Sequence, residues 1–257
     1  MSAAPTTAIV LAAGMGSRLQ DVWSDLPKGF VEIGGETLIE RSIRLLQERA
    51  VERVVVVAGH LAHAYHQLAK RIPGVEVVDN PDYADTGSMA SLARALERVD
   101  EAFLLLESDL FYEERALDTL LADAAPDVLL ASGPTGATDE VWVEALGGRL
   151  TGLSKDPAEL REVCGELVGI LKVSSSLGRL LGDAFADFER VQGHGRMAYE
   201  TDALVQVAQK RPVRVTVVND LLWGEVDYET HYRRVRDDVY PRWAAGRTSR
   251  TSGPKRE

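Results

Sequence analysis

Short apolar runs alternate with amphipathic stretches through the first half of the chain, and this alternation limits the folds that the chain can adopt. The apolar runs have the length of strands and occupy residues 8–13, 53–58, 75–78, 102–107 and 128–131. The stretches between them carry helical spacing at residues 37–50, 61–71, 88–99 and 113–124. Several runs are apolar on both faces, which is typical of parallel strands covered by helices. The pattern therefore predicts a doubly wound, mostly parallel α/β sheet with right-handed crossovers.

The rhythm changes after residue 131, where three strand-like runs follow one another without helices between them. These runs occupy residues 141–146, 149–154 and 167–173 and predict a small mixed or antiparallel extension of the sheet. Helical patterns return at residues 175–190 and 199–210, followed by a strand at 213–218 and a last helix from about Tyr228 to Trp243. We expect one domain over residues 1–243. Residues 244–257 hold four basic residues and one acidic residue without hydrophobic periodicity, which predicts a disordered basic tail.

Composition excludes several classes of protein. The 257 residues are 45% hydrophobic and 27% charged, as in soluble globular domains, and no apolar run reaches the ~18 residues of a membrane span. The N-terminus lacks the basic region of a secretion signal, and the single cysteine, Cys164, cannot form an internal disulfide. We therefore expect a cytoplasmic protein without a membrane partner. The net charge of −11 argues against a nucleic-acid partner, because phosphate backbones select basic surfaces.

The loop after the first predicted strand has the chemistry of an anion site. Gly14 and Gly16 permit positive φ angles and a close approach of the backbone to a ligand. Successive N–H groups in such a turn can bind an anion, and Arg18 can add a charge-assisted bond to a phosphate. The dinucleotide fingerprint and the P-loop motif are both missing from this loop. A tight strand–helix turn without a ligand is therefore the alternative interpretation.

A family resemblance extends over this loop and the segment after it. The residues LAAGMGSRL at 11–19, followed by PKGFVEIGGETLIERSI at 27–43, resemble the signature of MobA-like nucleotidyltransferases. These enzymes join a nucleoside triphosphate to a phosphorylated small molecule and release pyrophosphate. The resemblance implies a Rossmann-like fold and catalytic roles for Arg18 and Lys28, which would neutralise the triphosphate. It also implies a nucleotide-binding loop formed by Leu11, Ala12, Ala13, Gly14, Gly16 and Ser17. Gly29 stands where this family often has proline.

Two acidic segments are candidates for a metal site. Asp109 follows a predicted apolar strand, and a carboxylate there faces the crevice in which doubly wound sheets bind ligands. Magnesium prefers such hard oxygen ligands, although a strand-end aspartate can also form a turn or cap a helix. The segment WGEVD at 223–227 resembles the end of phosphocholine and phosphonate cytidylyltransferases, whose last aspartate binds the metal. The resemblance implies that Asp109 and Asp227 bind Mg²⁺, with Glu225 as a further ligand or substrate contact.

Two later segments resemble regions that bind the nucleotide base and the molecule to which the nucleotide is transferred, the acceptor. The run TGSMASL at 86–92 resembles 2-aminoethylphosphonate cytidylyltransferases and implies that Thr86, Gly87 and Ser88 contact the base, together with backbone near Ala58. Ser88 can alternatively be a helix N-cap. The run GELVGI at 165–170 matches the strand that lines the acceptor pocket in the same subgroup. The candidates for acceptor binding include cations for its anionic group and aromatic or acidic side chains for an amine or quaternary ammonium: Lys155, Glu166, Lys172, Tyr199, Glu200 and Trp223.

Together these features predict a Mg²⁺-dependent cytidylyltransferase. Residues 1–243 would form its catalytic domain, with CTP and a small phosphonate, most readily 2-aminoethylphosphonate, as its substrates. The same chemistry on phosphocholine is the nearest alternative, and a sugar-1-phosphate enzyme fits the later motifs poorly. A catalytically inactive nucleotide-binding protein is an alternative of another class. No sequence feature fixes the oligomeric state, and a homodimer is one expectation.

Overall fold

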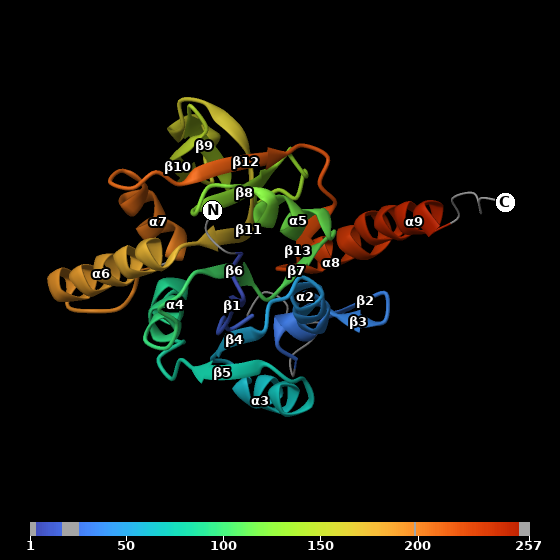
Figure 1. Cartoon of the computed structure of the whole chain (residues 1–257), viewed down its shortest axis with the longest axis horizontal. Coiled ribbons are helices and arrows are strands. Elements are labelled where there is room, and N and C mark those ends of the chain that lie inside the picture. The colour runs from blue at the N-terminus through green and yellow to red at the C-terminus, as the bar shows by residue number, and fades with distance from the viewer. Residues whose placement is uncertain (1–3, 17–25, 198, 252–257) are drawn as a thin grey trace.

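The computed structural model describes residues 4–16, 26–197 and 199–251, so that Ser17 and Arg18 lie outside the described residues. Its centre is a nine-stranded mixed sheet with helices on both faces (Figure 1). The α/β class predicted from the sequence is therefore confirmed. No helix among the described residues combines the length and apolar character that a membrane span requires.

One half of the sheet is parallel, as predicted. In spatial order it consists of β5 (Val75–Asp79), β4 (Arg53–Ala58), β1 (Thr7–Ala12) and β6 (Phe103–Glu107). The predicted runs lie within one residue of these strands. The carboxyl ends of β1 and β6 lie at the same edge, and the loops that follow them carry the first candidate site residues.

The other half of the sheet is mixed. Its strands are β11 (Val163–Val173), β8 (Val128–Ser132), β12 (Arg214–Val218), β10 (Arg149–Ser154) and β9 (Trp142–Leu146). The long strand β11 runs antiparallel to both β6 and β8, while β8 and β12 are parallel. The antiparallel strand β11 therefore lies in the middle of the sheet, whereas the sequence pattern had predicted a small mixed or antiparallel extension. β11 also begins at Val163, four residues before its predicted start, because its first residues pair with β9.

The two faces of the sheet bury alternate side chains under different helices. Ile9 and Leu11 of β1 face α4 (Ser88–Leu96), α6 (Ser175–Gln192) and α7 (Glu200–Ala208). Ala8 and Val10 face the opposite core, which is formed with α2 (Leu38–Gln47), α3 (Ala62–Arg71) and α5 (Arg115–Ala122). Figure 1 shows α4, α6 and α7 on one side of the strands and α2 and α5 on the other. Burial on both faces explains the continuous apolar runs of the sequence.

A third, smaller core lies beside the sheet and was missed by the sequence pattern. It contains two short antiparallel pairs of strands, β2 (Glu32–Ile33) with β3 (Glu36–Thr37) and β7 (Leu110–Tyr112) with β13 (Trp223–Glu225). These pairs pack against α8 (Glu229–Arg234) and the π-helical turn Val235–Val239. β13 pairs antiparallel with β7, and Glu225 lies opposite Leu110. Strands of two or three residues give no periodicity to read, which is why the sequence did not reveal them.

The expectation of a disordered tail from residue 244 is wrong up to Thr251, because helix α9 spans Tyr240–Thr251. Trp243 anchors this helix: its ring packs edge-on against Phe111, and its Nε1 donates to Glu114 Oε2 at 2.8 Å. Arg247 pairs with the same glutamate and lies over the Trp243 ring. These contacts come from distant parts of the chain, so local composition could not predict the helix.

Candidate active site

A cavity of about 420 Å³ opens at the carboxyl ends of β1 and β6. The loop after β1, the start of α4 and a group of acidic residues line it. Of the residues proposed for nucleotide binding, those at this cavity are Leu11, Ala12, Ala13, Gly14, Gly16, Thr86, Gly87 and Ser88. Ala58 is not among the lining residues. It is fully buried at the end of β4, where its carbonyl accepts a hydrogen bond from the backbone N–H of Asn80 at 2.7 Å.

The glycine loop needs glycine at one position in particular. Gly16 has a φ of +61°, and a Cβ on it would lie 3.3 Å from Lys28 Cγ. A larger residue would meet both backbone strain and the lysine side chain that crosses the cavity. The loop and Lys28 are therefore packed as one unit.

The hydroxyl groups near the start of α4 already donate hydrogen bonds within the protein. The Thr86 hydroxyl donates to the Asp82 carbonyl at 2.8 Å, and Ser88 Oγ donates to the Glu200 carboxylate. Gly87 is the N-cap of α4, so the structure does not support Ser88 as the cap. Ser88 instead joins the wall of this cavity to helix α7.

Lys28 lies in a short 3₁₀ turn that packs tightly against the end of β6. Gly29 makes this packing possible, because a Cβ there would lie 3.0 Å from Tyr65 Oη and 3.2 Å from the Ser108 carbonyl. Lys28 Nζ donates to Asp109 Oδ2 at 3.2 Å and also to Asp227 Oδ1. Burial alone would lower the pKa of Lys28, but the nearby carboxylates, Asp109 first, outweigh burial and raise it. The lysine is therefore a fixed positive charge at the cavity.

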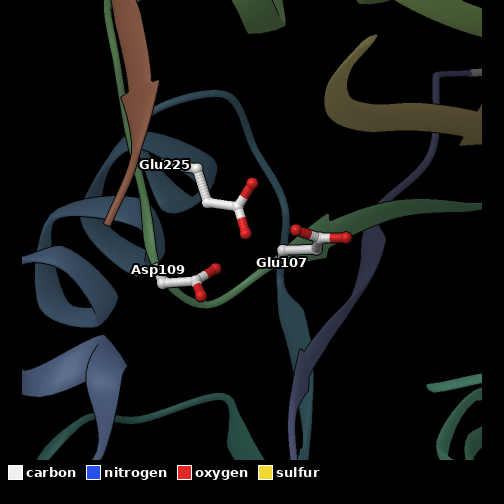
Figure 2. Close-up of side chains that lie close together, drawn as sticks. All are labelled: Glu107, Asp109 and Glu225. Atoms are coloured by element: carbon white, nitrogen blue, oxygen red, sulfur yellow. The ribbon is translucent and has the colours of Figure 1, made fainter. Parts of the chain in front are cut away.

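Three carboxylates gather beside this lysine. Glu107 ends β6, Asp109 follows two residues later, and Glu225 ends β13; one oxygen of each lies within 4.8 Å of the others (Figure 2). Asp227 stands next to the group and pairs with Lys28. The group differs from the predicted ligands in two respects: Glu107 joins Asp109 and Glu225, and Asp227 pairs with Lys28 beside the group instead of belonging to it. Glu107 was missed although it stands at the end of an apolar strand, which is the same signal that pointed to Asp109.

These carboxylates repel one another. The pKa of Glu225 is raised to about 8, mainly by burial and then by the charge of Asp109, while Lys28 acts in the opposite direction. Burial also raises the pKa of Glu107 well above its usual range, and Glu225 and Glu200 add to the effect. A single lysine thus compensates only part of this negative charge. The oxygen-rich, under-compensated group fits a hard divalent cation such as Mg²⁺.

A second cavity of about 530 Å³ meets the first at this group. The two cavities share Glu107, Tyr199, Glu225 and Asp227. Of the proposed acceptor residues, those lining the second cavity are Lys155, Glu166, Tyr199, Glu200 and Trp223. Further lining residues that sequence reasoning did not select include Asp139, Glu140, His231 and Arg234. Nothing in the sequence indicated these residues, because none of them stands in a recognisable motif.

Most of the proposed acceptor residues are already held by the protein. The Glu166 carboxylate accepts from the amide and the hydroxyl of Thr135 at 2.7 and 2.9 Å, and Trp223 Nε1 donates to Ser132 Oγ at 2.8 Å. Glu200 is engaged by Ser88, whereas Tyr199 is 51% exposed at the junction of the two cavities. Glu166, Glu200 and Trp223 therefore form a rigid wall.

The site thus consists of two adjoining cavities with an acidic group and a lysine between them. Comparison with known proteins assigns the chain to a family. Residues 8–170 match the MobA-like NTP transferase domain. The chain belongs to this family. The resemblance seen in the sequence is thereby confirmed, and the domain is that of a nucleotidyltransferase.

Two similar proteins are named for reactions of small phosphonates. CMP-5'-(3-aminopropyl)phosphonate synthase of Streptomyces rubellomurinus is 32% identical over 241 residues, which are 88% of this chain and 37% of that protein. The 2-aminoethylphosphonate cytidylyltransferase of Lancefieldella rimae is 33% identical over 110 residues, covering 42% of this chain and 45% of that protein. The chain thus spans less than half the length of these two relatives.

A solved structure shows the same fold. A CTP:phosphocholine cytidylyltransferase from Streptococcus pneumoniae superimposes with a TM-score of 0.76 over 90% of this chain and 97% of that one. The sequence identity is 21%, so the likeness extends to the fold alone.

One residue proposed from the sequence for acceptor binding lies away from the two cavities. Lys172 is only 7% exposed, and its Nζ donates to the Asp123 carbonyl at 2.6 Å, outside both cavities. The reason is the length of β11: Glu166 and Lys172 lie six residues apart on one strand, or roughly 20 Å at the usual rise. The strand carries Glu166 to the second cavity and Lys172 to the opposite end of the sheet. The prediction of Lys172 as an acceptor ligand is therefore wrong.

Proposed function

We propose that this protein is a Mg²⁺-dependent cytidylyltransferase that joins CMP from CTP to a small aminoalkylphosphonate and releases pyrophosphate. The observation that carries the proposal is the junction of two cavities at Lys28 and the carboxylates of Glu107, Asp109, Glu225 and Asp227. The glycine loop lines one cavity and suits a triphosphate, because its backbone can approach phosphate oxygens closely. The second cavity suits the acceptor.

The residues present suit a direct displacement at the α-phosphorus. The acceptor oxygen is already anionic, so no side chain has to activate it as a nucleophile. Lys28 stabilises the charge that develops on the α-phosphate, and its two aspartate partners keep its ammonium group in position. Bound at Asp109, Glu225 and Glu107 or Asp227, Mg²⁺ would supply charge neutralisation and alignment of the phosphate oxygens. The chain's own contribution is thus positioning and electrostatic stabilisation.

The chemistry of the acceptor cavity favours a primary ammonium over a quaternary one. A quaternary ammonium is recognised by several aromatic faces, and Tyr199 and Trp223 are the aromatic residues among the described lining. Trp142 of β9 is not among the residues that line the cavity. Carboxylates are more numerous, and they suit the N–H donors of a primary ammonium. The names of the two relatives agree with an aminophosphonate, whereas phosphocholine remains the second candidate through the shared fold.

Pyrophosphate release tests the proposal directly. The purified protein is assayed with Mg²⁺ and each of four nucleoside triphosphates against 2-aminoethylphosphonate, 3-aminopropylphosphonate, phosphocholine and glucose-1-phosphate. We expect release with CTP and an aminoalkylphosphonate, and loss of release on chelation of the metal. A preference for phosphocholine or glucose-1-phosphate would refute the acceptor class. CTP binding without turnover on any acceptor would favour the inactive nucleotide-binding protein.

A further inference from the structure

We propose that Asp139 is the specificity-determining residue that binds the ammonium group of the acceptor, with Lys155 beside it for the phosphonate. The inference rests on the proposed function and names the contact that selects the substrate. Asp139 lies in the loop between β8 and β9 and lines the acceptor cavity together with Lys155, which follows β10. Their side chains form a loose pair, with 3.9 Å between Lys155 Nζ and Asp139 Oδ2.

The loop that carries Asp139 is held in place just before this residue. Before it, both the amide and the hydroxyl of Thr135 donate to Glu166, and the Ala137 carbonyl accepts from His231 Nε2 at 3.1 Å. Thr138 adopts a φ of +78°, a conformation that side chains with a Cβ rarely take. Such a turn persists only where its surroundings hold it. Asp139 is therefore presented to the cavity in a defined position rather than on a free loop.

Asp139 is also a carboxylate with room for a new partner. Glu166 and Glu200 accept hydrogen bonds from Thr135 and Ser88, and Asp202 accepts from the Tyr199 amide at 3.2 Å. Asp139 has no side-chain hydrogen bond to any residue that the structure describes, only the loose contacts to Lys155 and to His231 at 3.7 Å. A bound ammonium can approach a carboxylate more closely than this and gain a charge-assisted hydrogen bond.

Asp139 differs from the neighbouring Glu140 in its electrostatic relation to Glu225. Asp139, Lys155 and Glu225 line the same cavity, and Asp139 raises the pKa of Glu225 while Lys155 lowers it. Burial lowers the pKa of His231, the other group beside Asp139, so its imidazole is neutral near pH 7 and does not compete with the substrate as a cation. A zwitterion fits this arrangement, because its negative end can face Lys155 and the metal while its ammonium replaces Lys155 as the partner of Asp139.

The test compares two acceptors that differ in the amine alone, 2-aminoethylphosphonate and ethylphosphonate. Wild-type protein is expected to prefer the amine-bearing acceptor in kcat/KM for pyrophosphate release. D139N keeps the size of the side chain and removes its charge, and should reduce this preference by about tenfold to a hundredfold, as expected for loss of one charge-assisted hydrogen bond. Its kcat/KM for ethylphosphonate should fall much less than its kcat/KM for 2-aminoethylphosphonate, because only the second acceptor carries the ammonium group.

Further variants establish whether a change in acceptor preference is specific to Asp139. D118N removes one negative charge from an exposed position on α5, away from both cavities, and should leave the preference unchanged. D139S repeats the test without the amide, and thermal denaturation establishes that each variant is folded. K155Q should lower kcat/KM for both phosphonates by the same factor, because both carry the anionic group.

Different failures have different meanings. A wild-type preference retained in D139N and D139S refutes the role of Asp139, and a larger loss in E140Q than in D139N transfers the role to Glu140. A wild-type protein that uses ethylphosphonate as well as its amine analogue also refutes the inference, while leaving the cytidylyltransferase intact. Absence of turnover by wild type with every acceptor refutes the proposed function itself.

Discussion

Replacing Lys28 by methionine tests the centre of the proposed mechanism. Methionine keeps a long unbranched side chain but removes the ammonium group that Asp109 and Asp227 hold at the junction of the two cavities. Loss of one preorganised donor at a developing charge typically lowers kcat by 10²–10³, or about 3–4 kcal/mol in the barrier. The fixed position of Lys28 and its raised pKa place the expected effect at the upper end of this range or beyond.

For Mg²⁺ binding, the same variant should have the opposite effect. Without Lys28, the neighbouring carboxylates lose their main compensating charge, so Mg²⁺ should bind at least as tightly as in wild type. We expect a low kcat with an Mg²⁺ half-saturation that is unchanged or reduced, measured by pyrophosphate release over a metal titration. K70A, at an exposed lysine on α3, is the matched control and should behave as wild type. Turnover of Lys28→Met within threefold of wild type would refute the role of this lysine.

Three further changes test the metal group, the glycine loop and the C-terminal helix. D109N should raise the Mg²⁺ concentration for half-maximal activity at least tenfold and lower kcat, and the reasoning fails if the metal titration is unaltered. G16A should raise KM for CTP about tenfold, because its Cβ would meet strain at a φ of +61° and approach Lys28; an unchanged KM with normal stability would contradict this. W243A should lower the free energy of unfolding by about 2–4 kcal/mol in denaturant titration, through lost ring packing, and a loss below 0.5 kcal/mol would mean that α9 is not anchored there.

The sequence predicted the parts of the fold that depend on local periodicity. Strands such as β1 and β4 are buried on both faces, and their apolar runs marked them to within one residue. The central position of β11 could not be read in the same way, because an apolar strand has the same pattern whether its neighbours run parallel or antiparallel. Strand order is a property of the packed sheet and leaves no trace in a single run.

The residues of the candidate site could likewise be predicted only where they stand in a local sequence pattern. Lys28 and Asp109 stand in recognisable local patterns, and the structure brings them within hydrogen-bond distance although 81 residues separate them. Asp139 and His231 carry no local signal, because their relation to the acceptor cavity arises only when a loop and a helix meet. Lys172 shows the converse error, since a residue that follows a family motif was carried by its strand to the other end of the sheet.

The position of Glu225 depends on the third small core rather than on the main sheet. β13 pairs with β7 alone, and Phe111 of β7 packs beneath Trp243 of α9. Arg41 is only 2% exposed, and its guanidinium lies over both rings, 4.3 and 4.7 Å from their centres, so that cation–π contacts join α2, β7 and α9. Because Glu225 is held through this chain of contacts, loss of α9 would loosen one wall of the carboxylate group while leaving the glycine loop in place. The C-terminal helix, which composition had assigned largely to a tail, is thus part of what positions the acidic centre.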